Sequence, residues 1–305
     1  MTAIFIDCPE FLAGLYTPEL KAIVPDLVLE IGDPSPGQTK AMVAGAKYVI
    51  NDHTYLPDEI LSAAPGLKAI VFMGTGASSY IDLAAAERRG VRVRTISGYG
   101  DRSIAEHAVA LMFAAGRRVA EMDRAIRAGG WQTVDGIEFL SKTLGVVGTG
   151  GIGTEMVRLG AGLGMNVIAW NRSGVAGGLP CEAVELDGLM ARADVVSLHL
   201  GLNEETTGII DRRRLALMKP AAILVNTARG ALVDEPAMIE ALKDGRLRHA
   251  GLDVFADEPL AAGHPLTALA NVTLTGHAAF MTREASIRLL RTALEYLREE
   301  RGKDR

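Results

Sequence analysis

Three side chains capable of acid–base chemistry or anion binding stand just behind apolar segments in the second half of the sequence. Arg229 follows AAILVNTA, Glu258 follows GLDVFAD, and His277 follows NVTLTG. A guanidinium binds an anion through two parallel hydrogen bonds. An imidazole ionises near neutral pH, so it can donate or accept a proton during a reaction. These residue types predict an active site that binds an anion and moves a proton.

Simpler roles for two of these residues stay open from the sequence alone. Arg229 could cap a strand or pair with Asp234. Glu258 precedes Pro259 in a segment that is typical of an ordinary turn, and Asp257 beside it is a rival carboxylate.

Five other histidines offer the same chemistry as the candidate acid–base histidine. We expect His107 to pack inside a long helix, and His199, at the end of an apolar segment, to be structural. The other three are expected in loops or near turns and match no motif: His53, His249 and His264.

The stretch beginning LGVVGTGGIG combines a strand pattern, a glycine turn, a helix pattern and a second strand pattern. In the turn, Gly148 allows a tight bend, Gly150 allows close approach of a pyrophosphate, and Gly153 allows the helix to pack on the strand. The helix start, which includes Gly151 and Ile152, directs free N–H groups and a positive dipole end at the phosphates. This context predicts a dinucleotide-binding loop.

The second strand of this unit ends with Asn171, Arg172 and Ser173, where a carboxylate is usual about 20 residues past the glycines. Such a carboxylate binds the ribose 2′-hydroxyl of NAD and repels the 2′-phosphate of NADP, at about 4 kcal/mol per unit-charge pair for a distance of about 4 Å. Asn171 removes this repulsion, Arg172 offers a fork for phosphate oxygens, and Ser173 offers a further donor. We therefore predict NADP(H) as the cofactor, with NAD(H) the alternative if Arg172 points into solvent.

Short apolar segments alternate with helical patterns along nearly the whole chain. The first series holds AIFID, LVLEIG, KYVIND, KAIVFMG and VRVRTIS; the second holds TLGVVG, NVIAWN, ADVVSLHL, AAILVNT, LRHAGLDV and NVTLTGH. This alternation predicts parallel sheets covered on both faces by helices. We expect two doubly wound α/β domains, with ligands at the carboxyl ends of the strands.

Two longer helical patterns lie outside these series. DRSIAEHAVALMFAAGRRVAEMDRAIRAGGW predicts one long helix that begins at Asp101 or Ser103 and ends at Gly129-Gly130. Its length suggests a bridge between units, and its apolar AVALMFAA would suit a two-fold contact in a homodimer. The C-terminal TREASIRLLRTALEYLREERG predicts an amphipathic helix that covers a core face.

The composition of the 305 residues argues against several classes of protein. Hydrophobic residues make up 49% and charged residues 23%, as in globular proteins. The net charge of −5 argues against binding to nucleic acid, and no apolar run reaches the roughly 18 residues that a membrane span needs. No metal is expected, because no His, Asp or Glu cluster has ligand spacing. Without a signal-peptide pattern, we expect a cytoplasmic protein with Cys8 and Cys181 as free thiols.

Four ordered segments resemble the D-isomer-specific 2-hydroxyacid dehydrogenases: GVVGTGGIG, VNTARGALVDE, GLDVFADEPL and TGHAAF. YIDLAAAERRGVRV and SIAEHAVALMFAAGRR also match that family, so the likeness extends from about Val71 onward. The resemblance implies a flavodoxin-like substrate-binding domain formed by residues 1–97 and 282–305. A Rossmann-type dinucleotide-binding domain, residues 98–281, would be inserted into it.

The resemblance also implies the catalytic roles. Arg229 would bind the carboxylate of a 2-oxo acid and polarise its oxo group. His277 would protonate the carbonyl oxygen as hydride arrives from the nicotinamide. Glu258 would pair with His277, because the family pattern selects the residue immediately before the proline.

Further binding residues follow from the same resemblance. In VFMGTGASSYIDL, the backbone N–H groups of a glycine loop would hold the substrate carboxylate: Gly74, Thr75 and Gly76. Asp253 would face the nicotinamide carboxamide, and Thr227 and Leu200 would line the cofactor cleft.

The sequence departs from the family pattern at Gly276 and Gly201, where proline is common, and at the missing ribose carboxylate. The implied activity is NADPH-dependent reduction of a small 2-oxo acid such as glyoxylate or hydroxypyruvate. Two alternatives stay open. One is an enzyme of a phosphorylated hydroxy acid, as in serine biosynthesis, and the other is a dinucleotide-sensing binding protein similar to corepressors of this fold.

Overall fold

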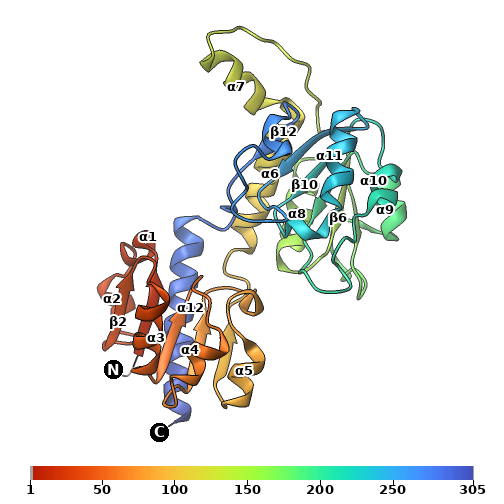
Figure 1. The fold of residues 1–305 in the computed structure, drawn as a ribbon. Helices are drawn as coiled ribbons and strands as arrows, with labels where there is room; N and C mark the ends of the chain where they lie inside the picture. Colours follow the sequence, from red (N-terminus) through yellow and green to blue (C-terminus); the bar gives the residue numbers. More distant parts are fainter. Residues whose placement is uncertain (1–2, 305) are drawn as a thin grey trace. The chain divides into compact units, whose positions relative to one another are not determined.

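The computed structural model describes residues 3–304, which divide into two compact units. Unit 1 comprises the residues up to Gly100 together with those from Thr282 onward, and unit 2 is Asp101–Met281. Figure 1 shows each unit as a sheet with helices packed on it. The chain therefore leaves unit 1, completes unit 2, and returns to unit 1 for its last helix.

Unit 1 contains a five-stranded parallel sheet in the order β2-β1-β3-β4-β5. This is the flavodoxin-like order of a doubly wound fold. The strands are β1 (Ala3–Cys8), β2 (Leu27–Ile31), β3 (Tyr48–Asn51), β4 (Ala69–Phe72) and β5 (Arg92–Thr95). All five had been predicted from their apolar segments.

Helices cover both faces of this sheet. One face packs against α1 (Glu10–Ala13), α2 (Pro18–Lys21) and α12 (Arg283–Lys303). The other packs against α3 (Pro36–Ala44), α4 (Asp58–Ser62) and α5 (Leu83–Arg88), while η1 (Ala77–Ser79) follows β4. The central strands are buried on both faces and therefore read as continuous apolar runs.

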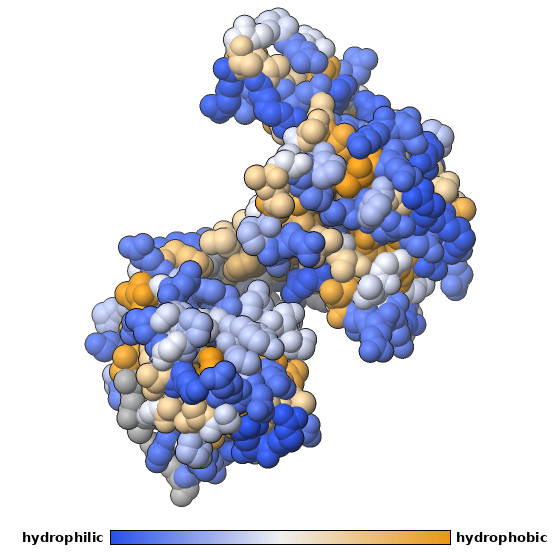
Figure 2. All heavy atoms as spheres, viewed as in Figure 1, coloured by the Kyte–Doolittle hydropathy of each residue, from blue (hydrophilic) through white to orange (hydrophobic). Residues whose placement is uncertain are grey.

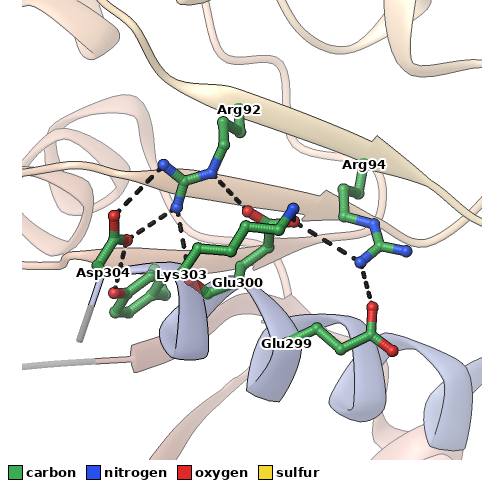
Figure 3. A network of polar contacts seen from close by, with 7 residues as sticks. Arg92, Arg94, Glu299, Glu300, Lys303 and Asp304 are labelled. Carbon is green, nitrogen blue, oxygen red and sulfur yellow. Dashed lines mark hydrogen bonds and ion pairs between the residues drawn. The ribbon is translucent and has the colours of Figure 1, made fainter.

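The C-terminal helix α12 is attached to unit 1 by apolar and ionic contacts. Leu289, Leu290, Leu294 and Leu297 are buried in the core, so the prediction of a core-covering helix is confirmed. Near the helix end, Glu300 accepts hydrogen bonds from Arg92 Nε and Lys303 Nζ, both at 2.5 Å. Figure 3 shows this network. Arg94 and Asp304 extend it on either side of Glu300.

Unit 2 contains a seven-stranded parallel sheet in the order β12-β11-β10-β9-β6-β7-β8. Numbered from its first strand, this is the Rossmann order 3-2-1-4-5-6 with one more strand at the end. The strands are β6 (Thr143–Val147), β7 (Asn166–Trp170), β8 (Glu182–Ala183), β9 (Val195–Leu198), β10 (Ala222–Asn226), β11 (Leu247–Leu252) and β12 (Val272–Leu274). The two-residue β8 was not predicted, since both of its residues are exposed and carry no apolar pattern. The predicted fold of two doubly wound units is confirmed.

The helices of unit 2 also divide between two faces of the sheet. On one face lie α6 (Asp101–Arg117) and α8 (Gly151–Gly162), packed around Met112, Met156 and Val157. On the other lie α9 (Leu186–Arg192), α10 (Arg212–Leu217) and α11 (Glu235–Lys243). The remaining elements are α7 (Val119–Arg127), η2 (Gly230–Leu232) and η3 (Pro265–Ala268).

The predicted single helix from Asp101 to Gly129 is wrong, because it is interrupted at Arg118. This residue has a left-handed backbone with φ 53° and separates α6 from α7. The backbone N–H of Ile137 donates to the carbonyl of Gly116 at 2.9 Å. In a continuous helix, this carbonyl would instead accept the N–H of the residue four positions later. Phe139 also packs so closely that a Cβ on Gly116 would lie 2.3 Å from its ring. The returning chain thus ends α6.

Polar side chains dominate the face of the molecule in Figure 2, with apolar side chains scattered among them. Within residues 3–304, no helix is both long and apolar enough to cross a bilayer. The same residues contain no group of three His, Cys, Asp or Glu side chains arranged to hold a metal ion.

Candidate active site

The candidate acid–base histidine lies in a tight turn behind β12. His277 has a positive φ of 50°, which is uncommon for a residue with a side chain. Its backbone N–H donates to the carbonyl of Asp253 at 2.7 Å. The next two N–H groups, of Ala278 and Ala279, donate to the Asp253 carboxylate at 2.9 Å each. Three hydrogen bonds to one residue thus hold the strained turn in place.

Asp253 itself is completely buried at the end of β11. Its carboxylate accepts a hydrogen bond from Thr275 Oγ1 at 2.6 Å, and Thr275 Oγ1 lies 3.0 Å from His107 Nε2. Burial acts to raise the pKa of Asp253, but hydrogen bonds from His107, Thr275 and the backbone hold it below its usual value. The carboxylate therefore supports the His277 turn, and its predicted contact with the nicotinamide stays a prediction.

Glu258 orients the ring of His277. Glu258 Oε2 lies 2.6 Å from His277 Nδ1, and Oε1 accepts the backbone N–H of Phe255 at 2.9 Å. A carboxylate accepts a hydrogen bond from the protonated Nδ1, so Nε2 is the ring atom left for a ligand. No side chain or backbone group within residues 3–304 bonds Nε2, and the side chain is 39% exposed. The rival carboxylate, Asp257, has no contact of this kind in the described part of the chain.

Arg229 lies behind β10 in a loop that packs tightly on the loop after β11. A Cβ on Gly230 would lie 1.9 Å from the carbonyl carbon of Phe255, so only glycine fits there. Asn226 holds the loop by donating to the carbonyl of Arg229 at 2.9 Å. The guanidinium donates to the carbonyl of Ala228 at 2.7 Å and pairs with no carboxylate within residues 3–304. Asp234 instead accepts the N–H of Ala237 as the N-cap of α11, so the alternative pairing with Arg229 does not form.

The glycine loop follows β6 as predicted, and its glycines are required for different reasons. Gly148 has φ 95°, and a Cβ on Gly153 would lie 1.8 Å from the Gly148 carbonyl oxygen. Gly151 is packed against the Asp101 carboxylate of α6, which the motif does not indicate. A Cβ on Gly150 would meet no atom of residues 3–304 within 4 Å. Open space at Gly150, beside the unpaired N–H groups that begin α8 at Gly151 and Ile152, fits a pyrophosphate.

Two buried polar atoms at neighbouring strand ends also fit a bound cofactor. Thr227 Oγ1, behind β10, and His199 Nδ1, behind β9, have no hydrogen-bonding partner within residues 3–304. Such atoms are uncommon in native proteins unless water or a ligand satisfies them. Leu200, next in the chain, packs over Gly148 of the glycine loop. The residues predicted to line the cofactor cleft therefore lie together in unit 2.

The three residues predicted to contact the adenosine ribose border one cavity of about 640 Å³ in unit 2. Asn171 Nδ2 donates to Ser173 Oγ at 2.9 Å and to the carbonyl of Gly174 at 3.0 Å. Asn171 Oδ1 accepts the N–H of Thr149 at 3.2 Å. Arg172 forms an ion pair with Glu205, from the loop after β9. Asn171 therefore shapes the turn, while Arg172 reaches across the cavity.

The predicted substrate loop of unit 1 follows β4 at the carboxyl edge of its sheet. The N–H of Gly74 is not free, because it donates to the carbonyl of Phe72 at 2.9 Å. No acceptor within residues 3–304 takes the N–H groups of Thr75 and Gly76. Two of the three predicted amides are thus free to bind an anion.

The other histidines fall mostly where the sequence indicated. His107 lies in α6, His199 is buried behind β9, and His264 caps η3. The expectation for His249 is wrong, because it lies in β11, fully buried and 3.0 Å from Thr273 Oγ1. Its alternation with apolar residues in LRHAGLDV was the signal for a strand position.

Sequence reasoning missed Thr275 and Glu205. Thr275 links Asp253 to His107, yet in the sequence it is an ordinary strand threonine. Glu205 is one of two adjacent glutamates in a polar loop, so only tertiary structure distinguishes it from Glu204.

Known proteins resemble this chain over most of its length. The profile of the D-isomer specific 2-hydroxyacid dehydrogenase NAD-binding domain matches residues 109–279. A glyoxylate reductase of Aeropyrum pernix is 40% identical over 283 residues, which cover 87% of this chain and 83% of that protein. The chain belongs to the D-isomer-specific 2-hydroxyacid dehydrogenase family. It is an oxidoreductase with an NAD-binding domain of the Rossmann type.

Other relatives leave the substrate and the choice of dinucleotide open. A D-3-phosphoglycerate dehydrogenase of Mycobacterium leprae is 41% identical over 261 residues, 83% of this chain and 49% of that protein. The chain thus spans about half of that relative's length. An acyclic imino acid reductase solved with NADPH and D-Arg has a TM-score of 0.83 at 28% identity, covering 95% of this chain and 94% of that one. Similarity alone therefore establishes a hydroxyacid dehydrogenase and no particular acid.

Proposed function

We propose that this chain is an NADPH-preferring reductase of a small, unphosphorylated 2-oxo acid, with glyoxylate and hydroxypyruvate as the first candidates. The observation that carries the proposal is the His277–Glu258 pair, whose Nε2 atom is open to a ligand. When bound, the reduced nicotinamide supplies a hydride to the 2-oxo carbon. The protein's own residues then have to bind the acid, orient it and provide a proton.

Each of these tasks has a candidate in the structure. Arg229, free of any carboxylate among the described residues, binds the acid's carboxylate as a bidentate partner. His277 Nε2 donates the proton to the carbonyl oxygen, on which negative charge develops during reduction. Glu258 holds Nδ1 and stabilises the imidazolium. In unit 1, the amides of Thr75 and Gly76 are free to bind an anion, and the family resemblance implies that this anion is the substrate carboxylate.

The preference for an unphosphorylated acid is supported by the charges at the carboxyl edge of unit 1. β3 lies between β1 and β4 in the sheet, so the loop after β3 neighbours the predicted substrate loop after β4. This loop carries Asp52 and His53, and it is held by Asp7, which accepts the N–H groups of residues 52–54. His53 Nε2 lies 2.6 Å from Asp33 and Nδ1 lies 3.0 Å from Asp52.

The cluster that His53 forms with Asp7, Asp33 and Asp52 is net negative as a whole. The hydrogen bond to Asp52 is the largest cause that raises the pKa of His53, to about 9, so the ring is a cation at neutral pH. One imidazolium faces three carboxylates, those of Asp7, Asp33 and Asp52. A phosphate dianion would meet like charge there, at a cost of several kcal/mol at close range. This favours a small acid over a phosphorylated one.

The preference for NADPH is supported by the missing ribose carboxylate, which the sequence already indicated. Asn171 stands where a ribose carboxylate is usual, and its amide is used within its own turn. Arg172 borders the adjoining cavity with a guanidinium suited to a 2′-phosphate. The NADPH-bound imino acid reductase that superposes on this chain is consistent with this preference.

We further propose a cytoplasmic homodimer. The segment AVALMFAA, which the sequence suggested for the contact, belongs to α6, and its Ala108, Leu111, Met112 and Ala115 are buried in the core of unit 2. We therefore assign the contact with a second copy to α7. Within unit 2, α7 and the coil after it extend away from the sheet (Figure 1), and α7 buries none of its residues. Val119 and Ile126 are half exposed, and Trp131 is 90% exposed. Aromatic and aliphatic side chains in this state are typical of protein interfaces. Analytical ultracentrifugation tests the dimer, and a monomer at micromolar concentration would contradict it.

A substrate panel with both reduced cofactors tests the proposed activity. Glyoxylate, hydroxypyruvate, pyruvate and 3-phosphohydroxypyruvate are each assayed by cofactor oxidation at 340 nm, with NADPH and with NADH. We expect the highest kcat/KM with NADPH and one of the unphosphorylated acids. A higher kcat/KM with the phosphorylated acid would overturn the substrate class, and cofactor binding without turnover on any acid would favour a sensing protein.

A further inference from the structure

The carboxylate that is missing from the end of β7 is supplied to the same cavity by another part of unit 2. The cavity of about 640 Å³ lies along the residues that follow β7 and β9. On the β7 side it is bordered by Asn171, Arg172 and Ser173, and on the β9 side by Asn203 and Glu205. Glu205 is therefore a negative charge at the predicted binding position of the adenosine ribose.

Glu205 is the ion-pair partner of Arg172. Both side chains are about two-thirds exposed, at 67% for Arg172 and 68% for Glu205. An exposed pair of this kind contributes little to stability and exchanges partners readily. The pair therefore costs little to open when a stronger anion reaches the guanidinium.

The other guanidinium at this cavity is not available in the same way. Arg214 Nε donates to Asp187 at 2.9 Å, and its Nη1 donates to the carbonyl of Ile209 at 2.7 Å. Asp187 is also bound by Arg213, at 2.7 and 3.1 Å. Because Arg214 is held by two acceptors, Arg172 is the cation that is able to change partner.

We propose that Glu205 sets the ratio of NADPH to NADH binding by competing with the 2′-phosphate for Arg172. This inference rests on the proposed role of Arg172 in NADPH binding. The 2′-phosphate has to displace the Glu205 carboxylate from the guanidinium before it can bind there. NADH, which has a hydroxyl there, leaves the ion pair in place. Glu205 therefore weakens NADPH binding selectively, and the chain accepts both cofactors with a moderate preference.

Calorimetric titration of the purified protein tests this without relying on turnover. Glu205→Gln removes the charge and keeps the shape, and Glu204→Gln is the matched control on the neighbouring exposed residue. Each variant is titrated with NADPH, NADH, adenosine 2′,5′-bisphosphate and AMP. We expect Glu205→Gln to tighten NADPH and adenosine 2′,5′-bisphosphate by about five- to tenfold, as loss of one close, screened charge pair predicts. NADH and AMP should change by less than about twofold.

Arg172→Gln completes a double-mutant cycle. If Glu205 acts through Arg172, the gain from Glu205→Gln should shrink to less than about twofold when Arg172 is already replaced. A full gain in that background, or equal tightening of NADPH and NADH, would overturn the inference. If Arg172→Gln leaves NADPH binding unchanged, the proposed NADPH preference itself fails. If Arg172→Gln weakens NADPH but Glu205→Gln has no effect, the preference stands and the role of Glu205 is refuted.

Discussion

Each unit contains a cluster of charged residues, and the ion-pair distances in the two clusters are similar. The clusters differ in whether all of their charged atoms have a partner. In unit 1, Glu300 has a side chain only 1% exposed and lies between Arg92, Arg94 and Lys303 (Figure 3). In unit 2, Glu258 contacts His277 at 2.6 Å, and both side chains remain about one-third exposed or more. Both clusters contain close pairs of opposite charge.

The difference lies in what is left unpaired. Every oxygen of Glu300 has a cationic partner, and the network connects α12 to β5. In the other cluster, no described residue bonds Nε2 of His277. A network in which every charged atom has a partner contributes to folding. A ring nitrogen that has no partner and is held on a rigid support can act on a ligand. The comparison therefore predicts that the two clusters respond to substitution in opposite ways.

The largest expected effect is on turnover, from His277→Asn. Asparagine tolerates the left-handed backbone of position 277 and removes the proton donor, so kcat should fall about a thousandfold. Steady-state assays of NADPH oxidation measure this with whichever acid the panel selects. Thermal unfolding and the Kd for NADPH serve as controls and should be nearly unchanged. A loss of less than about tenfold would show that another group supplies the proton.

Glu300→Gln should affect stability instead. Removing one charge from a buried ion-pair network leaves three cations with fewer partners, and we expect a loss of about 2 kcal/mol in the free energy of unfolding. Partial exposure of the cations limits the cost. Urea unfolding measures the loss, and kcat should stay within about twofold of the original.

Glu299→Gln is the matched control for that experiment. Glu299 pairs with Arg94 but is 55% exposed, so its replacement should cost less than about 0.5 kcal/mol. Equal losses for the two variants would mean that burial of Glu300 contributes nothing to the strength of the network.

Thr275→Val tests the comparison by removing a hydrogen bond that supports the His277 turn. The valine keeps the shape and removes one hydrogen bond to the buried Asp253 carboxylate, so we expect a loss of about 1–2 kcal/mol in stability. Because the turn positions His277, kcat should also fall about tenfold. Thr273→Val in β12 removes a similar bond, to His249, and should leave kcat unchanged. If both variants lower kcat equally, the effect is not specific to the turn.

The smallest expected effect is on the pH dependence of stability. It comes from the buried histidines and not from the partly exposed His277. Burial lowers the pKa of both His199 and His249 to about 4, from the ordinary 6.5. Below pH 6.5 the unfolded chain therefore takes up protons that the folded chain excludes, and stability falls as pH drops toward 4. Each histidine should contribute about 1 kcal/mol of loss between pH 6.5 and 5.5. Urea unfolding at several pH values should show this slope, reduced in His249→Gln.

The sequence predicted the fold almost completely. Of the twelve strands within residues 3–304, eleven correspond to the apolar segments AIFID through NVTLTGH, because strands buried on both faces need continuous apolar residues. It also placed the glycine loop, since backbone approach and tight turns require glycine whatever surrounds them. The break at Arg118 was not predictable, because it depends on Ile137 and Phe139 reaching Gly116 from a later part of the chain.

What the sequence determined about the candidate site is which residue types stand behind which strands, since these are local properties of the chain. Tertiary structure decided which of them meet. It set Glu258, which the family pattern had indicated, beside His277, assigned Asp253 and Thr275 to the support of the turn, and set Glu205 against Arg172. These contacts join segments 19 to 33 residues apart, and their geometry depends on how loops from different strands pack at one sheet edge. For Thr275 and Glu205, no local pattern carries that information.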